Sequence, residues 1–266
     1  MTMVITPQGH GLGWIPDIPD QRDKFFEPQA ALQRLAAAPL PKQTDLRTQC
    51  PPVYNQGQLG SCTANALAAA FDFDRHKEGK DFMTPSRLFI YWNERDLEGT
   101  VGSDAGAAIR DGVKVLHRVG TPPEVNWPYD ITKFTEKPTE NCFEIAEKNE
   151  ALTYMRIQRP AANKTFDMQA CLASGYPFVA GFSVYESFES PEVVKTGVVP
   201  MPQPGEKILG GHAIVVVGYD IDKSWFIVRN SWGDDWGDHG YFYMPFDYLT
   251  SEHLSSDFWL IKTVEA

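Results

Sequence analysis

The stretch Gln56–Phe71, QGQLGSCTANALAAAF, places a cysteine where a glycine-rich loop gives way to a helical pattern. Apolar residues recur in it at the spacing of one helical face, at Ala64, Leu67, Ala68 and Phe71. The pattern predicts a helix that begins near Ser61 and packs this face against a core. Cys62 then lies at the helix N-terminus, where free backbone N–H groups and the helix dipole favour a thiolate. Burial as a small hydrophobe is the alternative for any cysteine.

The composition excludes several classes of protein. With 266 residues, of which 42% are hydrophobic, the chain suits one large domain or two closely packed lobes and is not of a disordered type. A net charge of -11 without a cluster of Lys and Arg along the sequence argues against nucleic acid as a partner. No apolar run approaches the roughly 20 residues of a membrane span, so we expect no membrane partner.

The N-terminus and the cysteines bear on the compartment. Residues 1–20 lack a basic region followed by an apolar one and do not predict a secretory signal. A cytoplasmic location and export without a recognisable signal both stay open. The four cysteines, none in metal-ligand spacing, are Cys50, Cys62, Cys142 and Cys171. If Cys62 is a free thiol, at most one disulfide can form among the others, for which we favour simple packing.

The first 42 residues are rich in Pro and Gly. We interpret them as an extended arm, a short helix in EPQAALQRLAAA (residues 27–38) and a linker. The arm either lies on the surface or occupies a cleft. Trp14, in the segment WIPDIPD (residues 14–20), correspondingly either inserts into that cleft or packs on one lobe.

Helices are predicted in the first half of the chain and strands in the second. TPSRLFIYWNERDLEG (residues 84–99) has Thr84 as the expected N-cap and Pro85 at the first helical position, and AGAAIRDGVKVLHRVG (residues 105–120) ends at Gly120. Short aromatic and β-branched runs follow, at residues 176–184, 212–220, 224–232, 240–245 and 258–264. This order predicts an α+β protein with two lobes of different class.

The sequence GGHAIVVVGYDIDKSWFIVRNSWG (residues 210–233) predicts a hairpin with catalytic potential. If the hairpin is centred on Ile221, His212 and Asn230 lie directly opposite each other on one face. The amide oxygen of Asn230 could then accept an imidazole N–H, which fixes the tautomer of His212 and aims its other nitrogen outward. This is the base and its orienting group in a nucleophilic triad. A change of one residue in the turn would put the two side chains on opposite faces.

Gln56 completes a candidate site. It lies six residues before Cys62 in a loop flanked by Gly. Its amide could donate to a developing oxyanion together with the backbone N–H of Cys62. Cys, His, Asn and Gln together suit acyl transfer.

Three blocks of this sequence resemble those of papain-family cysteine proteases. Gln56-Gly57-x-x-Gly60-Ser61-Cys62 resembles the active-site loop, Gly211-His212-Ala213 the histidine block, and NSWGDDWGDHGY (residues 230–241) the asparagine block. The resemblance covers about Leu40 to Lys262 and is greatest to bacterial members with a short arm. It implies a papain-like fold with a helical lobe, an antiparallel β-barrel-like lobe and the active-site cleft between them. We therefore divide the chain into a pro-like arm (1–40), a mainly helical lobe (41–160) and a mainly β lobe (161–266).

The resemblance also implies the function. It indicates a cysteine-type peptidase, which we expect to be a monomeric endopeptidase acting on peptide or protein substrates without metal or cofactor. Cys62 would be the nucleophile, His212 the general base and then acid, and Asn230 its orienting partner. Gln56 would stabilise the oxyanion. A transamidase that uses the same residues, and a binding module on a protease fold, are the alternatives.

Substrate-binding residues follow from the same resemblance. Gly106, preceded by Ala105, would align the substrate main chain, and Gly211 with Ala213 would line the specificity pocket. Trp232 would shield the bond between His and Asn, and Trp236 would line the primed side of the cleft. The arm would restrict access to the cleft.

Some positions depart from the family pattern, and others are assigned no functional role. Leu59 replaces a cysteine that usually braces the active-site loop through a disulfide, and Thr63 replaces a tryptophan. Asp234, Asp235 and Asp238 crowd near His239, where we favour a solvated turn over a metal site. The remaining histidines are interpreted as surface or structural residues, namely His10, His76, His117, His239 and His253.

Overall fold

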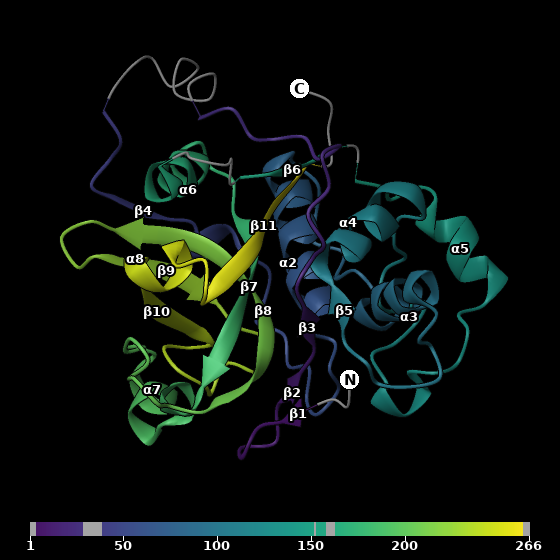
Figure 1. Cartoon of the computed structure of the whole chain (residues 1–266). Helices are drawn as coiled ribbons and strands as arrows, with labels where there is room; N and C mark the ends of the chain where they lie inside the picture. The colour runs from purple at the N-terminus through teal and green to yellow at the C-terminus, as the bar shows by residue number, and fades with distance from the viewer. Residues whose placement is uncertain (1–3, 29–38, 152, 158–162, 263–266) are drawn as a thin grey trace.

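The computed structural model describes residues 4–28, 39–151, 153–157 and 163–262. A sheet lies on one side of the molecule and a group of helices on the other, with the long helix α2 between them (Figure 1). The helices are α2 (Cys62–Lys77), α3 (Arg87–Glu98), α4 (Ile109–Arg118), α5 (Glu140–Ala146), α6 (Lys164–Ala173), α7 (Pro191–Thr196) and α8 (Phe246–Thr250). Short 3₁₀ turns lie at η1 (Arg47–Gln49), η2 (Ile131–Lys133) and η3 (Glu186–Glu189).

Seven strands form the large antiparallel sheet. Along it the order is β10-β9-β8-β7-β11-β6, with β4 paired to one end of β8. These strands are β4 (Gln43–Asp45), β6 (Thr153–Arg156), β7 (Phe178–Tyr185), β8 (Ile208–Asp220), β9 (Trp225–Arg229), β10 (Tyr241–Pro245) and β11 (Ser255–Lys262). The predicted strands of the second half are therefore present, and the fold is α+β and papain-like as expected.

Helix α2 is more deeply buried than its amphipathic pattern predicts. All residues from Cys62 to Asp74 are buried, because the helix packs against β8 of the sheet and against α3 and α4 of the helical lobe. A helix enclosed on all sides is hydrophobic or small around its whole circumference, and alanines at five of these positions let the neighbouring elements approach closely, namely Ala64, Ala66, Ala68, Ala69 and Ala70.

The predicted start of α3 is wrong by two residues. The N-cap is Ser86, whose Oγ accepts a hydrogen bond from the N–H of Phe89. Thr84 instead has a positive φ of 50°, and its N–H donates to the carboxylate of Asp72 at 3.2 Å. A carboxylate from another helix therefore outcompetes the Thr-Pro signal for the helix start.

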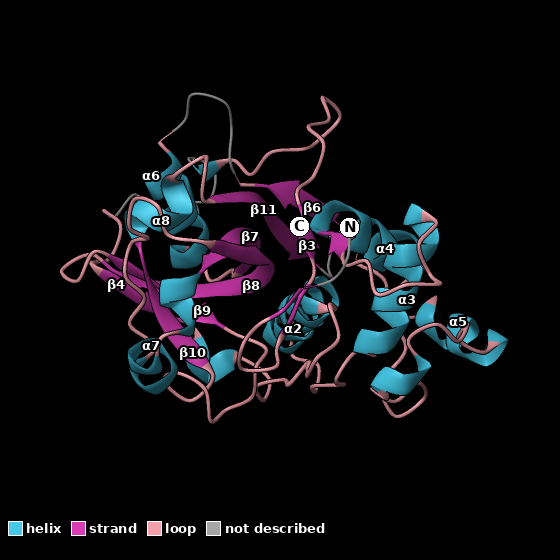
Figure 2. Ribbon diagram, turned by 60° about the horizontal axis from the view of Figure 1, so that its bottom comes forward, coloured by secondary structure: helices cyan, strands magenta, loops and turns pink. Residues whose placement is uncertain are grey.

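The N-terminal arm runs between the lobes (Figures 1 and 2). Strands β1 (Val4–Ile5) and β2 (Gly11–Leu12) form a small hairpin, and β3 (Trp14–Ile15) pairs in parallel with β5 (Ala107–Ala108) of the helical lobe. Most of the short helix predicted in residues 27–38 lies outside the described residues. The extended arm, however, is present and occupies the space between sheet and helices.

Two further observations bear on the sequence predictions. All four cysteines are free thiols. Within the described ranges, no helix is both long enough and apolar enough to cross a bilayer.

Candidate functional site

His212 and Asn230 are hydrogen-bonded, but through a register that differs from the predicted one. Nε2 of His212 lies 2.8 Å from Oδ1 of Asn230. The turn covers residues 221–224, and Val215 pairs with Arg229, so the register is shifted by two residues and direct opposition of His212 and Asn230 is wrong.

A bulge in β8 keeps the two side chains on one face. Near the turn Gly218 pairs with Ile227, and between Val216 and Gly218 the register slips by one residue. Without this slip Asn230 would be three positions from the residue opposite His212, on the other face of the sheet. With it the offset is two positions, which is a diagonal neighbour within side-chain reach.

The imidazole of His212 is fully enclosed. It is 0% exposed, and the ring of Trp232 lies over it at 4.8 Å between centroids. Because the amide oxygen of Asn230 can only accept, Nε2–H donates, which leaves Nδ1 of the neutral ring with a free lone pair. No hydrogen-bond partner for Nδ1 is found among the described residues. Burial lowers the pKa of His212 to about 4, against the opposing effect of the Asn230 bond.

Cys62 is the first residue of α2 and is also 0% exposed. Burial raises the pKa of its thiol to about 12, although the backbone N–H groups of Ala213, Gly13 and Thr63 act in the opposite direction. The expected preference for a thiolate is therefore not met in this state of the molecule. The loss of hydration outweighs the effect of the helix N-terminus, and both the thiol of Cys62 and the imidazole of His212 are neutral.

Gln56 is buried and held from both ends. Its Oε1 accepts a hydrogen bond from the hydroxyl of Ser231 at 2.6 Å. Its Nε2 donates to the carbonyl oxygens of Leu59 and of Gly11, each at 3.0 Å. One of the two amide protons is thus directed at a carbonyl oxygen of the arm.

The loop before Cys62 is braced by a carboxylate. The N–H of Gly60 donates to both oxygens of Asp104, at 3.0 and 3.2 Å, and the hydroxyl of Tyr91 binds the same carboxylate. Leu59 itself is buried in the core. Thr63 donates its hydroxyl to Glu94 at 2.8 Å, and burial raises the pKa of that carboxyl well above its usual range.

The arm passes directly over these residues. The carbonyl oxygen of Gly13 accepts the N–H of Ala107 at 2.8 Å, and the ring of His10 stacks on Trp232 with centroids 4.4 Å apart. Trp14 is buried: its main chain pairs with Ala107 of the helical lobe, while its ring lies against Gly181 and Gly211 of the β lobe. His10, interpreted from the sequence as a surface or structural residue, is also part of the contact that the arm makes.

Glycines make room for the arm on both walls. A Cβ on Gly211 would lie 2.4 Å from the carbonyl oxygen of Trp14, and one on Gly181 would lie 2.0 Å from the Trp14 ring. A Cβ on Gly106 would lie 2.1 Å from the oxygen of Gly13. Gly181 and Gly211 in the sheet and Gly106 in the helical lobe therefore lie on opposite sides of the arm.

The other predicted binding residues are placed differently. Gly106, in the left-handed region with a φ of 76°, donates its N–H to the hydroxyl of Tyr91, so the main-chain donor toward the arm is Ala107. Ala105 is half-buried beside it. Trp236 is 4% exposed and meets the edge of Trp232 at 5.2 Å, behind that ring.

A group of charged residues anchors the arm where it leaves the site. Oδ2 of Asp257, in β11, accepts the indole N–H of Trp14 at 3.2 Å and the N–H of Asp17 at 2.8 Å. Oδ2 of Asp17 in turn accepts the indole N–H of Trp259 at 2.8 Å. Burial, followed by the charge of Asp257, raises the pKa of Asp17 to about 6. Nothing in the sequence pattern links these positions.

In the acidic turn before His239, the carboxylate of Asp238 binds side chains of the same chain. Asp238 pairs with Arg47 at 3.1 Å and binds the hydroxyl of Tyr243. Among the described residues, no group of three or more carboxyl, imidazole or thiol side chains is placed to hold a metal ion.

Comparisons with known proteins place this geometry in a family. The papain family cysteine protease domain matches residues 40–253. An uncharacterized peptidase C1-like protein of Acanthamoeba polyphaga mimivirus is 42% identical over 95% of this chain and 86% of its own length. Xylellain, a cysteine protease from Xylella fastidiosa, is 43% identical, covers 97% of both chains and superposes with a TM-score of 0.85. Human cathepsin L2 is 29% identical over 76% of this chain and 60% of its own length.

Proposed function

The chain belongs to the papain family of cysteine proteases, and from this premise we propose that Cys62 is its nucleophile and His212 its general base. As a papain-like cysteine peptidase it cleaves peptide bonds in peptide or protein substrates. The observation that carries the assignment is the bond of 2.8 Å between His212 and Asn230, because it holds the proton on Nε2 and leaves Nδ1 free to take one.

The reaction follows from these positions. Nδ1 of His212 takes the proton of the Cys62 thiol, and the thiolate attacks the scissile carbonyl carbon. Nε2 of Gln56 and the N–H of Cys62 stabilise the oxyanion of the tetrahedral intermediate. His212 then protonates the leaving amine, and water hydrolyses the thioester. Asn230 keeps the ring oriented through each proton transfer.

Substrate contacts are assigned by analogy with the arm. We propose that Ala107 offers its main-chain N–H to the substrate backbone, next to Ala105 and Gly106. Gly211, with Ala213 beside it, leaves the opposite wall open for a side chain. Trp232 shields the His–Asn bond from water, and Trp236 supports Trp232 from behind.

The arm restrains this site in our proposal. It covers Cys62 and His212, which are both 0% exposed, and its burial of them keeps the pair neutral. The backbone N–H of Gly13, in the arm, is directed at the sulfur of Cys62, so the arm occupies the place where a substrate would approach the thiol. Displacement of the arm would rehydrate the pair and favour thiolate and imidazolium.

A direct experiment compares Cys62→Ala with the unaltered chain. A mixed peptide library should be cleaved at internal bonds only by the unaltered chain, and an epoxide inhibitor should label Cys62 alone among the four cysteines. Hydrolysis that survives in a folded Cys62→Ala protein would remove Cys62 from the mechanism. Cleavage confined to chain ends would rule out an endopeptidase.

The transamidase alternative concerns the acceptor of the acyl group. Mass spectrometry of the products in the presence of an added amine separates the two reactions, because transfer leaves an amide where hydrolysis leaves a carboxylate. We propose hydrolysis by a single chain, since one chain supplies every residue of the site.

A further inference from the structure

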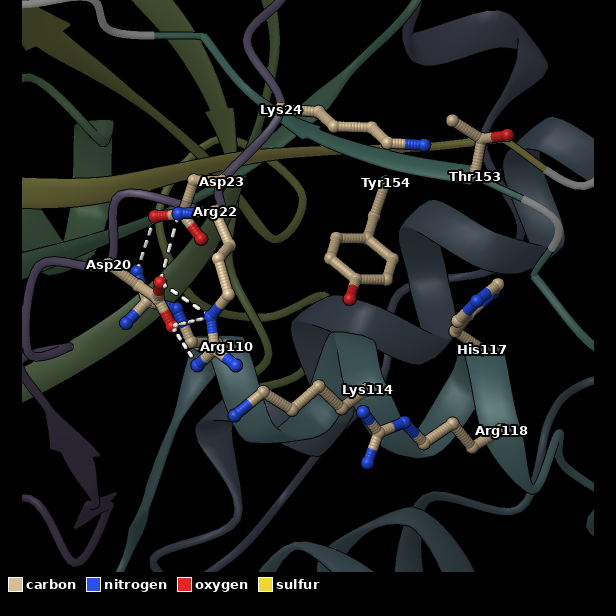
Figure 3. Close-up of a pocket in the computed structure, with 10 residues that line it drawn as sticks. All are labelled: Asp20, Arg22, Asp23, Lys24, Arg110, Lys114, His117, Arg118, Thr153 and Tyr154. Atoms are coloured by element: carbon tan, nitrogen blue, oxygen red, sulfur yellow. Dashed lines mark hydrogen bonds and ion pairs between the residues drawn. The ribbon is translucent and has the colours of Figure 1, made fainter.

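A cationic cavity lies where the arm meets the helical lobe. Its volume is about 270 Å³, and it is lined by the arm between Asp20 and Lys24, by one face of α4 and by the start of β6 (Figure 3). Five cationic side chains and a histidine surround it, against two carboxylates, in a chain whose net charge is -11. The cationic residues are Arg22, Lys24, Arg110, Lys114 and Arg118.

The charges come from segments that only the fold brings together. Arg110, Lys114, His117 and Arg118 follow one another at the spacing of one helical face. Figure 3 shows Arg22 of the arm close to Arg110 of α4, and Lys24 of the arm extended on the opposite side of the cavity, above Tyr154. Folding thus brings like charges together around one cavity, which is unfavourable unless an anion is bound there.

The two carboxylates are already engaged. Both oxygens of Asp20 bind the guanidinium of Arg22. Asp23 is shared by Arg110 and Arg156. These pairs fix the arginines in place but leave neither carboxylate of the cavity lining to balance Lys24 or Arg118.

The remaining cations are available. Lys24 and Arg118 are exposed, and neither has an ion-pair partner in the described part of the chain. Lys114 shares its charge only with Asp111, at 2.8 Å. Nδ1–H of His117 donates to the carbonyl oxygen of Ala151 at 2.8 Å, which orients the ring at the edge of the cavity.

We propose that this cavity binds a small oligophosphate and that the bound anion clamps the arm onto the helical lobe. A compact cavity with several converging cations suits a small anion of high charge, and guanidinium groups match the geometry of phosphate oxygens. The ligand contacts Lys24 on the arm and Arg118 on α4, so its binding energy opposes the departure of the arm. The clamp, although not the site, rests on the proposed restraint of the peptidase by its arm.

The test uses the full chain and inorganic triphosphate as the probe. Isothermal titration should give saturable binding at one site. The double variant Lys24→Ala/Arg118→Ala should bind at least about tenfold more weakly, since two charge-assisted contacts are lost. The control Lys148→Ala/Lys195→Ala also loses two exposed positive charges. Its affinity should stay within about twofold, because both lysines lie outside the cavity and their charges are screened by salt.

Several outcomes would overturn the site. Absence of saturable binding, equal affinity in the Lys24→Ala/Arg118→Ala protein, or an equal loss in the control would each do so. Citrate provides a comparison at similar charge, and binding as tight as that of triphosphate would overturn the phosphate assignment.

The clamp is tested separately by the rate at which an epoxide labels Cys62. Triphosphate should slow the labelling of the unaltered chain and leave the rate of the Lys24→Ala/Arg118→Ala protein unchanged. Binding without slower labelling would overturn the clamp while the site stands. Because labelling needs no substrate turnover, and titration needs no reactive thiol, failure of the peptidase assignment would be recognised independently.

Discussion

Two successive stretches of the arm, Gly11–Trp14 and Asp17–Asp23, are held against the body by different interactions. The first fits by shape and main-chain hydrogen bonds, since glycines on both sides permit the close approach. The second is held by carboxylates, arginines and an indole N–H. We call them the plug and the anchor. Because of this difference, docking of the plug should be weakened by a single added methyl group, whereas docking of the anchor should depend on pH and salt.

The largest effect is expected from Gly13→Val, which breaks the plug alone. A Cβ at this position would lie 1.8 Å from the carbonyl oxygen of Gly60. Overpacking of this kind together with the lost hydrogen bond to Ala107 weakens docking by about 3 kcal/mol, or about 100-fold. Peptidase activity and Cys62 labelling should rise by up to that factor. Ile18→Ala, at an exposed position of the same arm, is the control, and equal rates in both proteins would mean that the plug does not limit access.

Asp17→Ala tests the anchor and should have a smaller effect. The variant removes the acceptor for the N–H of Arg110 and for the indole of Trp259, but it also removes a buried carboxylate. These effects partly cancel, so we expect activity to rise about tenfold. The labelling rate of Cys62 measures the change. A rise larger than that of Gly13→Val would invert the order of plug and anchor.

The pH dependence should distinguish the two stretches further. Asp17 has a pKa raised to about 6 in the docked arm, while in a free arm it would titrate near its ordinary value of about 4. The docked state therefore binds the additional proton, so docking is strongest below about pH 4 and weakens as the pH rises through about 6. The labelling rate relative to that of Gly13→Val should therefore rise with pH over this range. A flat ratio, or the same slope in Asp17→Ala, would contradict this assignment.

His10→Ala should have the smallest effect. It removes a ring that stacks on Trp232 at 4.4 Å, a contact worth about 1 kcal/mol. We expect Cys62 labelling to rise about fivefold. A change as large as that of Gly13→Val would show that the plug is held mainly through Trp232.

The sequence was sufficient for the family and the fold class, because these depend on local motifs and periodicity. It failed on the hairpin register because the turn covers residues 221–224 and is not centred on Ile221, and because the bulge between Val216 and Gly218 shifts the pairing by one residue. Gly218 is a local signal of such a bulge, but a glycine alone does not give the direction of the shift. The N-cap of α3 was misplaced because Asp72 acts from another helix. A contact between residues far apart in the sequence cannot be predicted from the few residues around the start of a helix.

The protonation state of the site was also beyond the sequence. A helix N-terminus predicts a thiolate at Cys62, but the arm that covers it determines the hydration of the sulfur. Asp257 binds both Trp14 of the plug and Asp17 of the anchor, from which it is separated by 243 and 240 residues along the chain. Only the fold makes these contacts visible.

The contact between Trp14 and Asp257 also orders events in folding. The two residues are 243 positions apart, so the arm is synthesised long before the strand that anchors it. Long-range contacts form late because the intervening chain must be ordered first. Cys62, His212 and Asn230 all precede Asp257 in the chain, and the site can therefore assemble before its cover is fastened. The arm pairs with Ala107 of the helical lobe early in the chain, but its contact with Asp257 is possible only once β11 has been added, after Cys62, His212 and Asn230 have all been synthesised.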